Sequence, residues 1–492
     1  MVRRRDARRM SATREKMFIG GQWIESSDGS VRPTLNPFDQ SVLAEIPAAT
    51  EDDARAAIAA ASKAFHDPAW AKMDPAERGR LLRKVAALIY ERADDLAKTE
   101  TLDNGKPLRE AKGDVLFAAQ TFEYYAGWAD KIEGQVIPVP GPRFNYTRRE
   151  PLGVTVHIIP WNYPFQLGCR SVAPALAAGN TVVAKPASET PLSFLKLAKI
   201  MEDAGLPKGV FNVVTGSGAK IGPVLVSAKE TAGVVLTGSV PTGQELLKEA
   251  ARKIVPVTLE LGGKSPNIVF PDANLDKAVK GAAFGIFMNA GQMCWAGSRL
   301  LVHESIHDEF VGKLADFART WKAGSGLEKD TRIGPLVSQG HHKTVSSYVE
   351  KGKAEGAKLV LGGARPAEPA LAHGNFLTPT IFTDVDPKMT IFREEIFGPV
   401  LSVSKFGNDD EALRLANAVD FGLYAGVWTS NLQRAHRFAA ELESGQVAIN
   451  EYPVTFPQTP FGGFKMSGIG HEQGSGVFNF YTRTKSVMVN LG

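Results

Sequence analysis

The sequence predicts an α/β protein with two doubly wound domains, because short apolar strands alternate with helices in two separate series. The strands of the first series are expected at 154–159, 181–184, 210–214 and 234–237. The second series begins at 267–270 and continues past 299–302. Strands that alternate with helices in this way are typical of a mostly parallel sheet covered on both faces.

The helices and the remaining strands also have local signals. Thr50 is expected to cap an alanine-rich helix, and Asp74-Pro75 to open another. Two segments fit neither series: 134–153 is interpreted as a polar hairpin, and 478–489 as an exposed β segment. Unpaired edge strands are a liability in a monomer, so an oligomer is expected, with a pair of loose edge strands as the alternative.

The composition is that of a globular protein without a large charge excess. Of the 492 residues, 43% are hydrophobic and 22% are charged, which are values typical of globular proteins. The length is enough for about three domains of ordinary size. A net charge of +4 is too small to predict a nucleic acid or a membrane as a partner. No apolar run reaches about 18 residues, the length needed to span a bilayer. The two cysteines, Cys169 and Cys294, lack metal-site spacing, so we expect no metal and a cytoplasmic location.

Residues 1–16 hold six arginines and a lysine but no apolar stretch, so they are not interpreted as a secretory signal. A disordered basic tail or an upstream start is expected, with a cleaved organelle peptide as the alternative.

Cys294 and Glu260 are the most informative residues, because they offer a nucleophile and a base. Cys294 follows an apolar helical stretch at a small, polar-flanked break, where a thiol can face a cleft. A thiolate can attack a carbonyl carbon, although a free thiol with a pKa near ~8.5 is mostly protonated at neutral pH. Taken singly, a buried structural cysteine and a glutamate at a strand end are the plainer interpretations.

Asn162 strengthens the catalytic interpretation. It lies in Pro160-Trp161-Asn162-Tyr163-Pro164, directly after a buried strand. Its side-chain amide can donate to the oxyanion that forms when a thiolate adds to a carbonyl, an interaction worth roughly 3 to 4 kcal/mol in enzymes. A rigid turn with an aromatic plug is the alternative.

With these residues in place, the chain resembles the aldehyde dehydrogenase superfamily from about Phe18 to the C-terminus. The matching segments occur in the family's order and are Pro160-Trp161-Asn162, Lys185-Pro186-Ala187-Ser188, Thr237-Gly238-Ser239 with Gly243, Glu260 with Cys294, Glu395-Ile396-Phe397-Gly398-Pro399, and 460–468. Each segment alone is a weak signal, whereas the ordered set is specific. The resemblance implies NAD(P)-linked oxidation of an aldehyde to a carboxylic acid.

The resemblance also implies a role for each catalytic residue. Cys294 would attack the aldehyde, Asn162 and the Cys294 N–H would hold the oxyanion, and Glu260 would activate the water that hydrolyses the thioester. Glu472 would relay the proton outward. Relatives that transfer the acyl group to coenzyme A typically lack a glutamate at the position of Glu260, so hydrolysis is expected.

The coenzyme is expected at the glycine turn 237–243, between a strand and a helix from about Thr242 whose N-terminal amides can face pyrophosphate. The glycine triplet within 216–222 is one residue too long for the dinucleotide fingerprint and is interpreted as a strand-to-helix turn. By resemblance, the coenzyme residues are Pro160, Trp161, Lys185, Ser188, Gly238, Ser239, Gly243, Leu261, Glu395 and Phe397. Strongly NAD-selective relatives often carry glutamate at the position of Ser188, so serine leaves NADP open beside NAD.

The substrate tunnel is expected to be aromatic. Its expected lining is Tyr163, Phe165, Leu167, Arg170, Met293, Trp295, Phe456 and Phe461. Arginine at the position of Arg170 occurs in relatives that act on acid semialdehydes or on aromatic aldehydes, and pairing with a structural carboxylate is the alternative. We therefore expect an aromatic aldehyde or an acid semialdehyde, with an aliphatic or amine-derived aldehyde as the alternative substrate.

A cysteine hydrolase is the competing function. It would need a histidine base, and none of the nine histidines lies in a motif around Cys294. The nearest to a recognised segment is His471.

The expected organisation follows from these assignments. It comprises the tail 1–16, a coenzyme-binding domain at 17–133 and 154–260, and a catalytic domain at 261–473. The resemblance implies that 134–153 and 474–492 form an oligomerisation arm, and that the partner is a second copy, in a homodimer or homotetramer.

Overall fold

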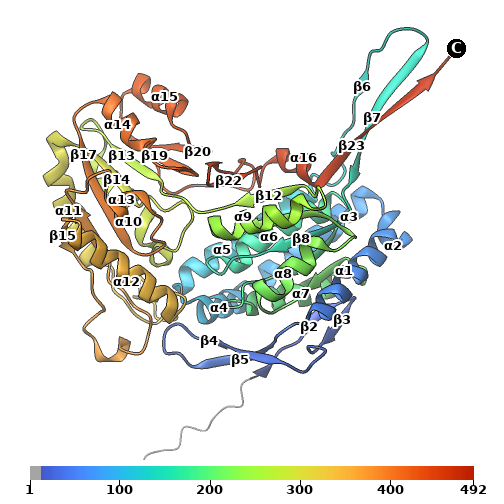
Figure 1. Cartoon of the computed structure of the whole chain (residues 1–492), viewed down its shortest axis with the longest axis horizontal. Helices are drawn as coiled ribbons and strands as arrows, with labels where there is room; N and C mark the ends of the chain where they lie inside the picture. The colour runs from blue at the N-terminus through green and yellow to red at the C-terminus, as the bar shows by residue number, and fades with distance from the viewer. Residues whose placement is uncertain (1–12) are drawn as a thin grey trace, which may run out of the picture.

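The structure is a computed structural model that describes residues 13–492. It has two lobes, each with its own central sheet, and a β arm that projects from one lobe (Figure 1). The first twelve residues of the expected basic tail lie outside the described residues. Thr13 and Arg14 form strand β1 (Thr13–Arg14), which pairs with β5 (Val42–Pro47). The expected disordered tail of 1–16 is therefore too long, because backbone pairing already holds these two residues.

The first sheet has eight strands in the order β22-β12-β11-β8-β9-β10-β2-β3. Its five central strands are parallel and are β8 (Val154–Ile158), β9 (Thr181–Lys185), β10 (Phe211–Val213), β11 (Thr231–Thr237) and β12 (Val257–Glu260). The edge strands β2 (Met17–Ile19), β3 (Gln22–Ile24) and β22 (Gly468–Ile469) pair antiparallel. Because β9 and β11 lie on opposite sides of β8, strand order reverses there, and such sheets bind ligands at the carboxyl ends beside this reversal.

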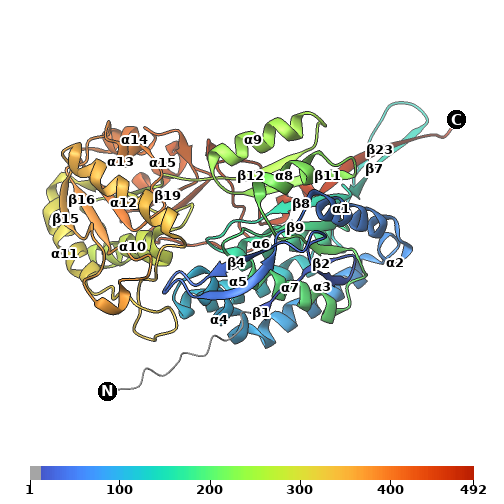
Figure 2. The ribbon, with the colours of Figure 1, turned by 60° about the horizontal axis from the view of Figure 1, so that its bottom comes forward.

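Helices cover both faces of this sheet (Figure 2). One face carries α1 (Glu51–His66), α8 (Gly218–Ser227) and α9 (Val240–Ala251). The other carries α6 (Pro164–Ala177) and α7 (Leu192–Ala204), against which α3 (Pro75–Glu91), α4 (Ala93–Asn104) and α5 (Leu108–Ala126) pack. Thr50 caps α1 through a capping box, and Pro75 occupies the first turn of α3, as the sequence predicts.

The second sheet has seven strands in the order β15-β16-β17-β14-β13-β19-β20. The strands are β13 (Pro266–Val269), β14 (Arg299–His303), β15 (Lys358–Leu361), β16 (Thr380–Thr383), β17 (Val400–Phe406), β19 (Tyr424–Trp428) and β20 (Gln446–Ile449). All pair in parallel except β15. The helices of this lobe are α10 (Leu275–Phe287), α11 (His307–Arg319), α12 (Gln339–Ala354), α13 (Thr390–Arg393), α14 (Asp409–Ala416) and α15 (Leu432–Glu441). The predicted pair of α/β domains is therefore confirmed.

The arm consists of β6 (Val136–Ile137), β7 (Arg143–Pro151) and β23 (Thr482–Asn490). β7 and β23 pair antiparallel along their full length. The expected β segment starts too early, because 478–481 form the short helix α16 (Phe478–Tyr481). Phe478 and Tyr481 lie three residues apart on one face of this turn and are buried in the core beside α5 and α6.

The expected boundary of the catalytic domain at residue 473 also needs correction. β22 leaves the second lobe and pairs with β12, so that Gly468 lies opposite Glu260. This return of the chain brings the segment that carries Glu472 alongside β12 of the first sheet. Among residues 13–492, no helix is both long and apolar enough to cross a bilayer.

Candidate active site

A cavity of about 610 Å³ opens at the carboxyl ends of the central strands and reaches the second lobe. Three of the expected catalytic residues line it together: Asn162, Glu260 and Cys294. The expected coenzyme residues that also line it are Pro160, Trp161, Lys185, Ser188, Gly238, Ser239, Glu395 and Phe397. The motifs dispersed over the sequence therefore meet in one cavity between the domains.

Cys294 is presented by a loop that reverses sharply after α10. The short turn Met288–Gly291 contains three consecutive residues with positive φ: Asn289 at 45°, Ala290 at 52° and Gly291 at 74°. Left-handed backbone is costly for a residue such as alanine and persists where neighbours hold it in place. The loop leaves Cys294 partly accessible, whereas Cys169 is fully buried in α6.

Buried hydrogen bonds hold this reversal. The Asn289 backbone N–H donates to Glu110 Oε2 over 2.8 Å, and Asn289 Nδ2 donates to the Asn162 carbonyl over 2.8 Å. Gln292 Nε2 donates to the Asn289 carbonyl, while Gln292 Oε1 accepts from the Val337 N–H. This network was not predicted from the sequence. Asn289 and Gln292, two polar residues next to the apolar end of α10, could have indicated it.

Asn162 is buried and points toward the same loop. Its Nδ2 donates to the Gln292 carbonyl over 3.0 Å, two residues before Cys294. A side-chain amide has two N–H groups, so this bond fixes the amide and leaves the other hydrogen for a ligand. The position is that of a donor directed toward atoms bound next to the thiol.

Burial in the cavity disfavours the ionised forms of Cys294 and Glu260. Burial raises the pKa of Cys294 to about 12, an effect that Arg170 opposes and that Glu260 and Glu395 reinforce. Burial also raises the pKa of Glu260 well above its usual range, again with Arg170 opposing. At neutral pH the thiol is therefore protonated, and its attack on a carbonyl requires a base. Both carboxylate oxygens of Glu260 lack a hydrogen-bond partner among the described residues, so they are available to a thiol or a water.

Glu472 does not line the cavity but lies behind it. It is ion-paired with Arg170, and its backbone exchanges hydrogen bonds of 2.7 Å with Phe461. Arg170 was expected to contact an acid semialdehyde or an aromatic aldehyde, with a structural carboxylate as the alternative partner. Glu472 supplies that anion, so the alternative of a structural carboxylate partner is the arrangement that the structure contains.

The expected substrate residues do not all meet. The Phe461 ring lies 5.6 Å from the Trp295 ring and 4.8 Å from the Arg170 guanidinium, so these three side chains pack together, although none of them lines the cavity. The others are dispersed: the Lys106 ammonium covers the Tyr163 ring at 3.8 Å, Met293 is buried, Phe456 is 56% exposed, and Phe165 and Leu167 are buried in α6. Phe165 belongs to the core beneath α6, because its ring is fully buried there.

The turn after β11 can hold a phosphate group. Ser239 caps α9, and the Ser239 hydroxyl accepts from the Thr242 N–H. The helix begins at Val240, two residues earlier than expected. Thr237, Gly238, Ser239 and Thr242 line the cavity, so the helix N-terminus faces it. Gly243 and Leu261 do not line it. A Cβ at Gly243 would lie 2.9 Å from Leu261 Cδ1, so this glycine provides space for Leu261.

A cationic region lies at the ends of β9 and β4 (Val31–Leu35). Lys185 is buried, and its Nζ donates to the Pro186 carbonyl over 3.0 Å. Burial lowers the pKa of Lys185 to about 8. The charge of Arg32 lowers this pKa further, whereas the charge of Glu189 raises it. Ser188 donates to the Gly216 carbonyl over 2.9 Å. Arg32 was missed because it lies at no motif position, yet it lines the cavity together with Glu189, the neighbour of Ser188.

A carboxyl group and an aromatic cluster come from the second lobe. Glu395 accepts from the Gly263 N–H over 2.9 Å, and burial raises the pKa of Glu395 to about 7. The Trp161 ring lies 5.2 Å from Phe397 and 5.1 Å from His341. His341 is bonded through Nε2 to the Phe397 carbonyl, and no motif signalled it. Flat rings, an anion-binding helix end and buried polar groups in one elongated cavity fit a nicotinamide dinucleotide.

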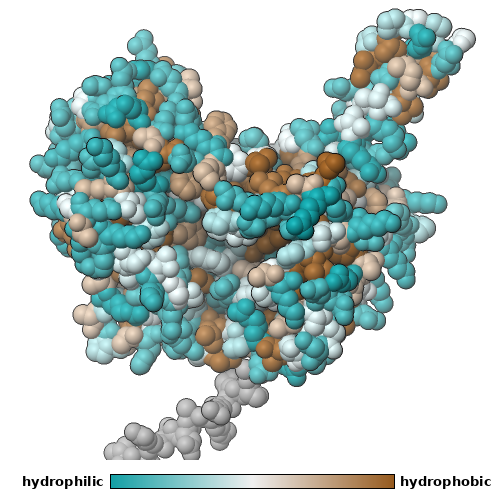
Figure 3. Space-filling view, in the orientation of Figure 1, coloured by the Kyte–Doolittle hydropathy of each residue, from teal (hydrophilic) through white to brown (hydrophobic). Residues whose placement is uncertain are grey.

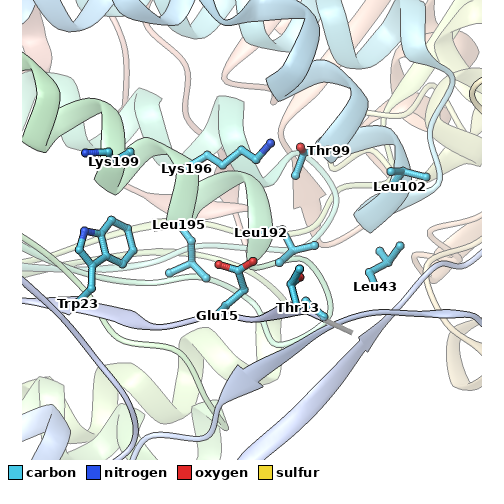
Figure 4. Close-up of a pocket in the computed structure, with 11 residues that line it drawn as sticks. Thr13, Glu15, Trp23, Leu43, Thr99, Leu102, Leu192, Leu195, Lys196 and Lys199 are labelled. Carbon is cyan, nitrogen blue, oxygen red and sulfur yellow. The ribbon is translucent and has the colours of Figure 1, made fainter. Parts of the chain in front are cut away.

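A second cavity of about 450 Å³ lies between the N-terminal strands, α4 and α7 (Figure 4). Apolar side chains, including Trp23, Leu192 and Leu195, line it. Lys196 at its edge is already bonded to Asp95. No cysteine or histidine lines this cavity, and no cluster of potential metal ligands occurs within residues 13–492.

The fold and the cavity define a dinucleotide-binding oxidoreductase with a cysteine at its reacting end. The sequence matches the model of the aldehyde dehydrogenase family over residues 23–487, and the chain belongs to that family. It is 44% identical over 478 residues to the betaine aldehyde dehydrogenase of Bacillus subtilis, which covers 97% of each chain.

Solved structures agree with this assignment. The NAD⁺ complex of an aldehyde dehydrogenase from Bacillus cereus is 45% identical, with a TM-score of 0.95 and 97% of each chain covered. The betaine aldehyde dehydrogenase of Staphylococcus aureus in complex with NAD⁺ is 40% identical, with a TM-score of 0.96 and coverage of 97% of this chain and 98% of that one. The protein is thus an NAD(P)-dependent aldehyde dehydrogenase, and the predicted family and coenzyme class are confirmed.

Replacing Asn289 by alanine should impair turnover without weakening coenzyme binding. The change removes the bond to the Asn162 carbonyl and places alanine at a φ of 45°. Misplacement of reacting groups by about 1 Å can cost about 100-fold, so we expect kcat/KM for an aldehyde to fall by about 10- to 100-fold.

Asn274→Ala is the matched control, because Asn274 caps the other end of α10. It should lower stability by about 1 kcal/mol and leave kcat/KM unchanged. Steady-state kinetics and thermal unfolding of both variants check this, and equal kinetic effects would show that Asn289 does not position the site.

Proposed function

We propose that this aldehyde dehydrogenase acts through a covalent Cys294 adduct and releases a carboxylic acid by hydrolysis, with Glu260 as the base. The observation that carries the proposal is the meeting of Asn162, Glu260 and Cys294 in one cavity. A cysteine hydrolase is not favoured, because His341, the histidine that lines this cavity, is bonded to the Phe397 carbonyl.

The first half of the reaction forms a carbon–sulfur bond. Glu260 takes the proton of the Cys294 thiol as the sulfur adds to the aldehyde carbon. The carbonyl oxygen becomes an oxyanion, and Asn162 Nδ2 and the Cys294 N–H donate to it. The nicotinamide coenzyme, when bound, accepts the hydride that leaves this carbon as the carbonyl re-forms in a thioester.

The second half breaks the carbon–sulfur bond. Glu260 takes a proton from water, whose oxygen adds to the thioester carbon. The sulfur leaves as a thiolate and is reprotonated, and the acid is released. Because the pKa of Glu260 is raised, the group is a strong enough base once it is ionised. Glu472, behind Glu260, is proposed to pass the proton toward the solvent.

Glu260→Gln should separate the two halves, because water can still take the thiol proton slowly and allow the aldehyde to be oxidised, whereas hydrolysis of the thioester depends on Glu260. We expect about one equivalent of NAD(P)H per active site, followed by a stall, in stopped-flow absorbance. Cys294→Ala should form no NAD(P)H while its coenzyme affinity stays unchanged. Continuous turnover by Glu260→Gln would mean that another base serves.

We infer that the preferred substrate is an aldehyde with an apolar or aromatic body and no distal carboxylate. The Arg170 charge is already paired with Glu472, and Glu260 adds a second carboxyl group to the same region. A carboxylate on the substrate would therefore be buried without a free cation to pair with. The two contacting rings of Trp295, which follows Cys294 in the chain, and Phe461 support an aromatic aldehyde. An amine-derived aldehyde is the second candidate, because relatives are named betaine aldehyde dehydrogenases.

For the coenzyme, we infer that NADP is accepted beside NAD. Ser188 places no carboxylate at the predicted ribose position, and Arg32 and Lys185 both line the cavity there. These two cations favour a 2′-phosphate, whereas Glu189 opposes it.

An aldehyde panel measured with NAD and with NADP checks both inferences. Benzaldehyde should exceed succinic semialdehyde by at least about tenfold in kcat/KM, since burial of a carboxylate without a partner costs more than about 1.4 kcal/mol. Ser188→Glu should weaken NADP far more than NAD, with Ser217→Ala as the control from the same cavity. A preference for the semialdehyde, or equal losses with both coenzymes, would contradict the respective inference.

We further propose that the arm joins copies of this chain in a homodimer or homotetramer. Apolar side chains are exposed on the arm at Val136, Ile137, Phe144, Met488 and Leu491, and brown surface among hydrophilic residues marks the arm in Figure 3. Its outer strands β6 and β23 have unpaired edges, which a second copy can cover.

Light scattering should accordingly give a mass that is a multiple of 53.0 kDa. Met488→Lys combined with Val136→Lys should lower that mass, because charges would be buried without partners in the interface. Ile254→Lys, at an exposed apolar residue outside the arm, is the control that should keep the wild-type mass. A wild-type protein that elutes as a monomer would refute the proposal.

A further inference from the structure

Three ionisable side chains lie buried together next to the reacting thiol. They are Arg170 from α6, Glu260 from the end of β12 and Glu472 from the segment after β22, and none is more than 3% exposed. Arg170 is ion-paired with Glu472, whereas Glu260 has no hydrogen-bond partner among the described residues. The cluster therefore contains one cation for two carboxyl groups.

Backbone contacts fix the positions of these charges. Gly468 in β22 is paired antiparallel with Glu260, which holds the chain before Glu472 alongside β12. Phe461 and Glu472 exchange two backbone hydrogen bonds of 2.7 Å, and the Phe461 ring covers the Arg170 guanidinium at 4.8 Å. The guanidinium thus cannot turn to the solvent, and its charge acts through a medium in which charges interact strongly.

The charge balance of the cluster depends on Arg170. Two ionised carboxylates beside one guanidinium would leave a buried net negative charge, whereas one proton shared by the two carboxyl groups makes the cluster neutral. Burial and the charge of Glu472 raise the pKa of Glu260, and Arg170 opposes both effects. Burial likewise raises the pKa of Glu472, and Arg170 again opposes it.

The other ionisable groups that face the cluster do not replace this cation. Tyr125 from α5 donates to the Gly474 carbonyl, and Tyr481 from α16 donates to the Ser171 carbonyl. Burial raises the pKa of both tyrosines, so they stay neutral. Cys294 and Glu395, on the cavity side, are groups that become negative on ionisation.

We propose that Arg170 is a positioning residue for deacylation: its fixed charge keeps the Glu260–Glu472 pair at one shared proton, so that Glu260 can act as a base. This inference rests on the proposed function and assigns Arg170 to water activation instead of substrate recognition. Without the cation, the neutral state of the cluster has both carboxyl groups protonated. A protonated Glu260 cannot take a proton from water.

The test is the pH dependence of acyl-enzyme hydrolysis, followed by rapid quench after the NAD(P)H burst with benzaldehyde. In Arg170→Met, the acid limb should move to higher pH by about 1 unit or more, since Arg170 lowers the pKa of Glu260 and this opposing charge is lost. Arg170→Lys should restore most of the shift. In Glu472→Gln the limb should move to lower pH, because a negative charge next to Glu260 is lost.

Arg78→Met is the matched control. Arg78 is a half-buried arginine that donates to the Ala177 carbonyl at the far end of α6. It should lose stability while its acid limb stays at the wild-type pH. An unmoved limb in Arg170→Met would overturn the inference, and if that variant does not fold, an unmoved limb in Glu472→Gln would overturn it. Failure of the wild type to form NAD(P)H from any aldehyde would instead reject the proposed function.

Discussion

The hydrogen bond from Asn162 to the Gln292 carbonyl joins the two domains at the atoms that would react. Asn162 lies in the loop between β8 of the coenzyme sheet and α6, whereas Gln292 belongs to the loop that follows α10 in the other domain. The bonds of Asn289 to Glu110 and Asn162 reinforce this contact. Because the Cys294 loop contains three residues with positive φ, it would relax if these bonds were lost, and the thiol would leave the donor that faces it.

Burial sets the electrostatics of the site and limits what each group can do. The same exclusion of water raises the pKa of Cys294, Glu260 and Glu395, so the resting site holds few ionised groups. Hydrogen bonds and charges are stronger in such surroundings, which favours stabilisation of a developing oxyanion. A permanently charged guanidinium is therefore a strong influence, and Arg170 is placed where it opposes the effect of burial on three acidic groups.

Much of the fold and part of the site could be predicted from the sequence. Alternating strands and helices were visible because each strand is a short apolar run, and Asn162, Glu260 and Cys294 stood in recognisable motifs. The partner of Arg170 could not be found in this way, because Glu472 reaches it only through the return of β22 to the first sheet. Arg32 and His341 were missed for the same reason: each enters the cavity from a segment without a motif. The start of α16 was misjudged because its aromatic residues suit a strand as well as a buried helical turn.

The account depends most on the claim that the acyl group is carried by Cys294 and released to water. Reaction of the wild-type enzyme with benzaldehyde and coenzyme in ¹⁸O-labelled water, followed by acid quench and mass spectrometry, tests it directly. The account predicts an acyl group on the peptide that contains Cys294 and ¹⁸O in the carboxylate of the product. An acyl group on another residue would contradict the account. So would a product acid that carries no ¹⁸O, provided that the unlabelled aldehyde has not exchanged its oxygen with the water.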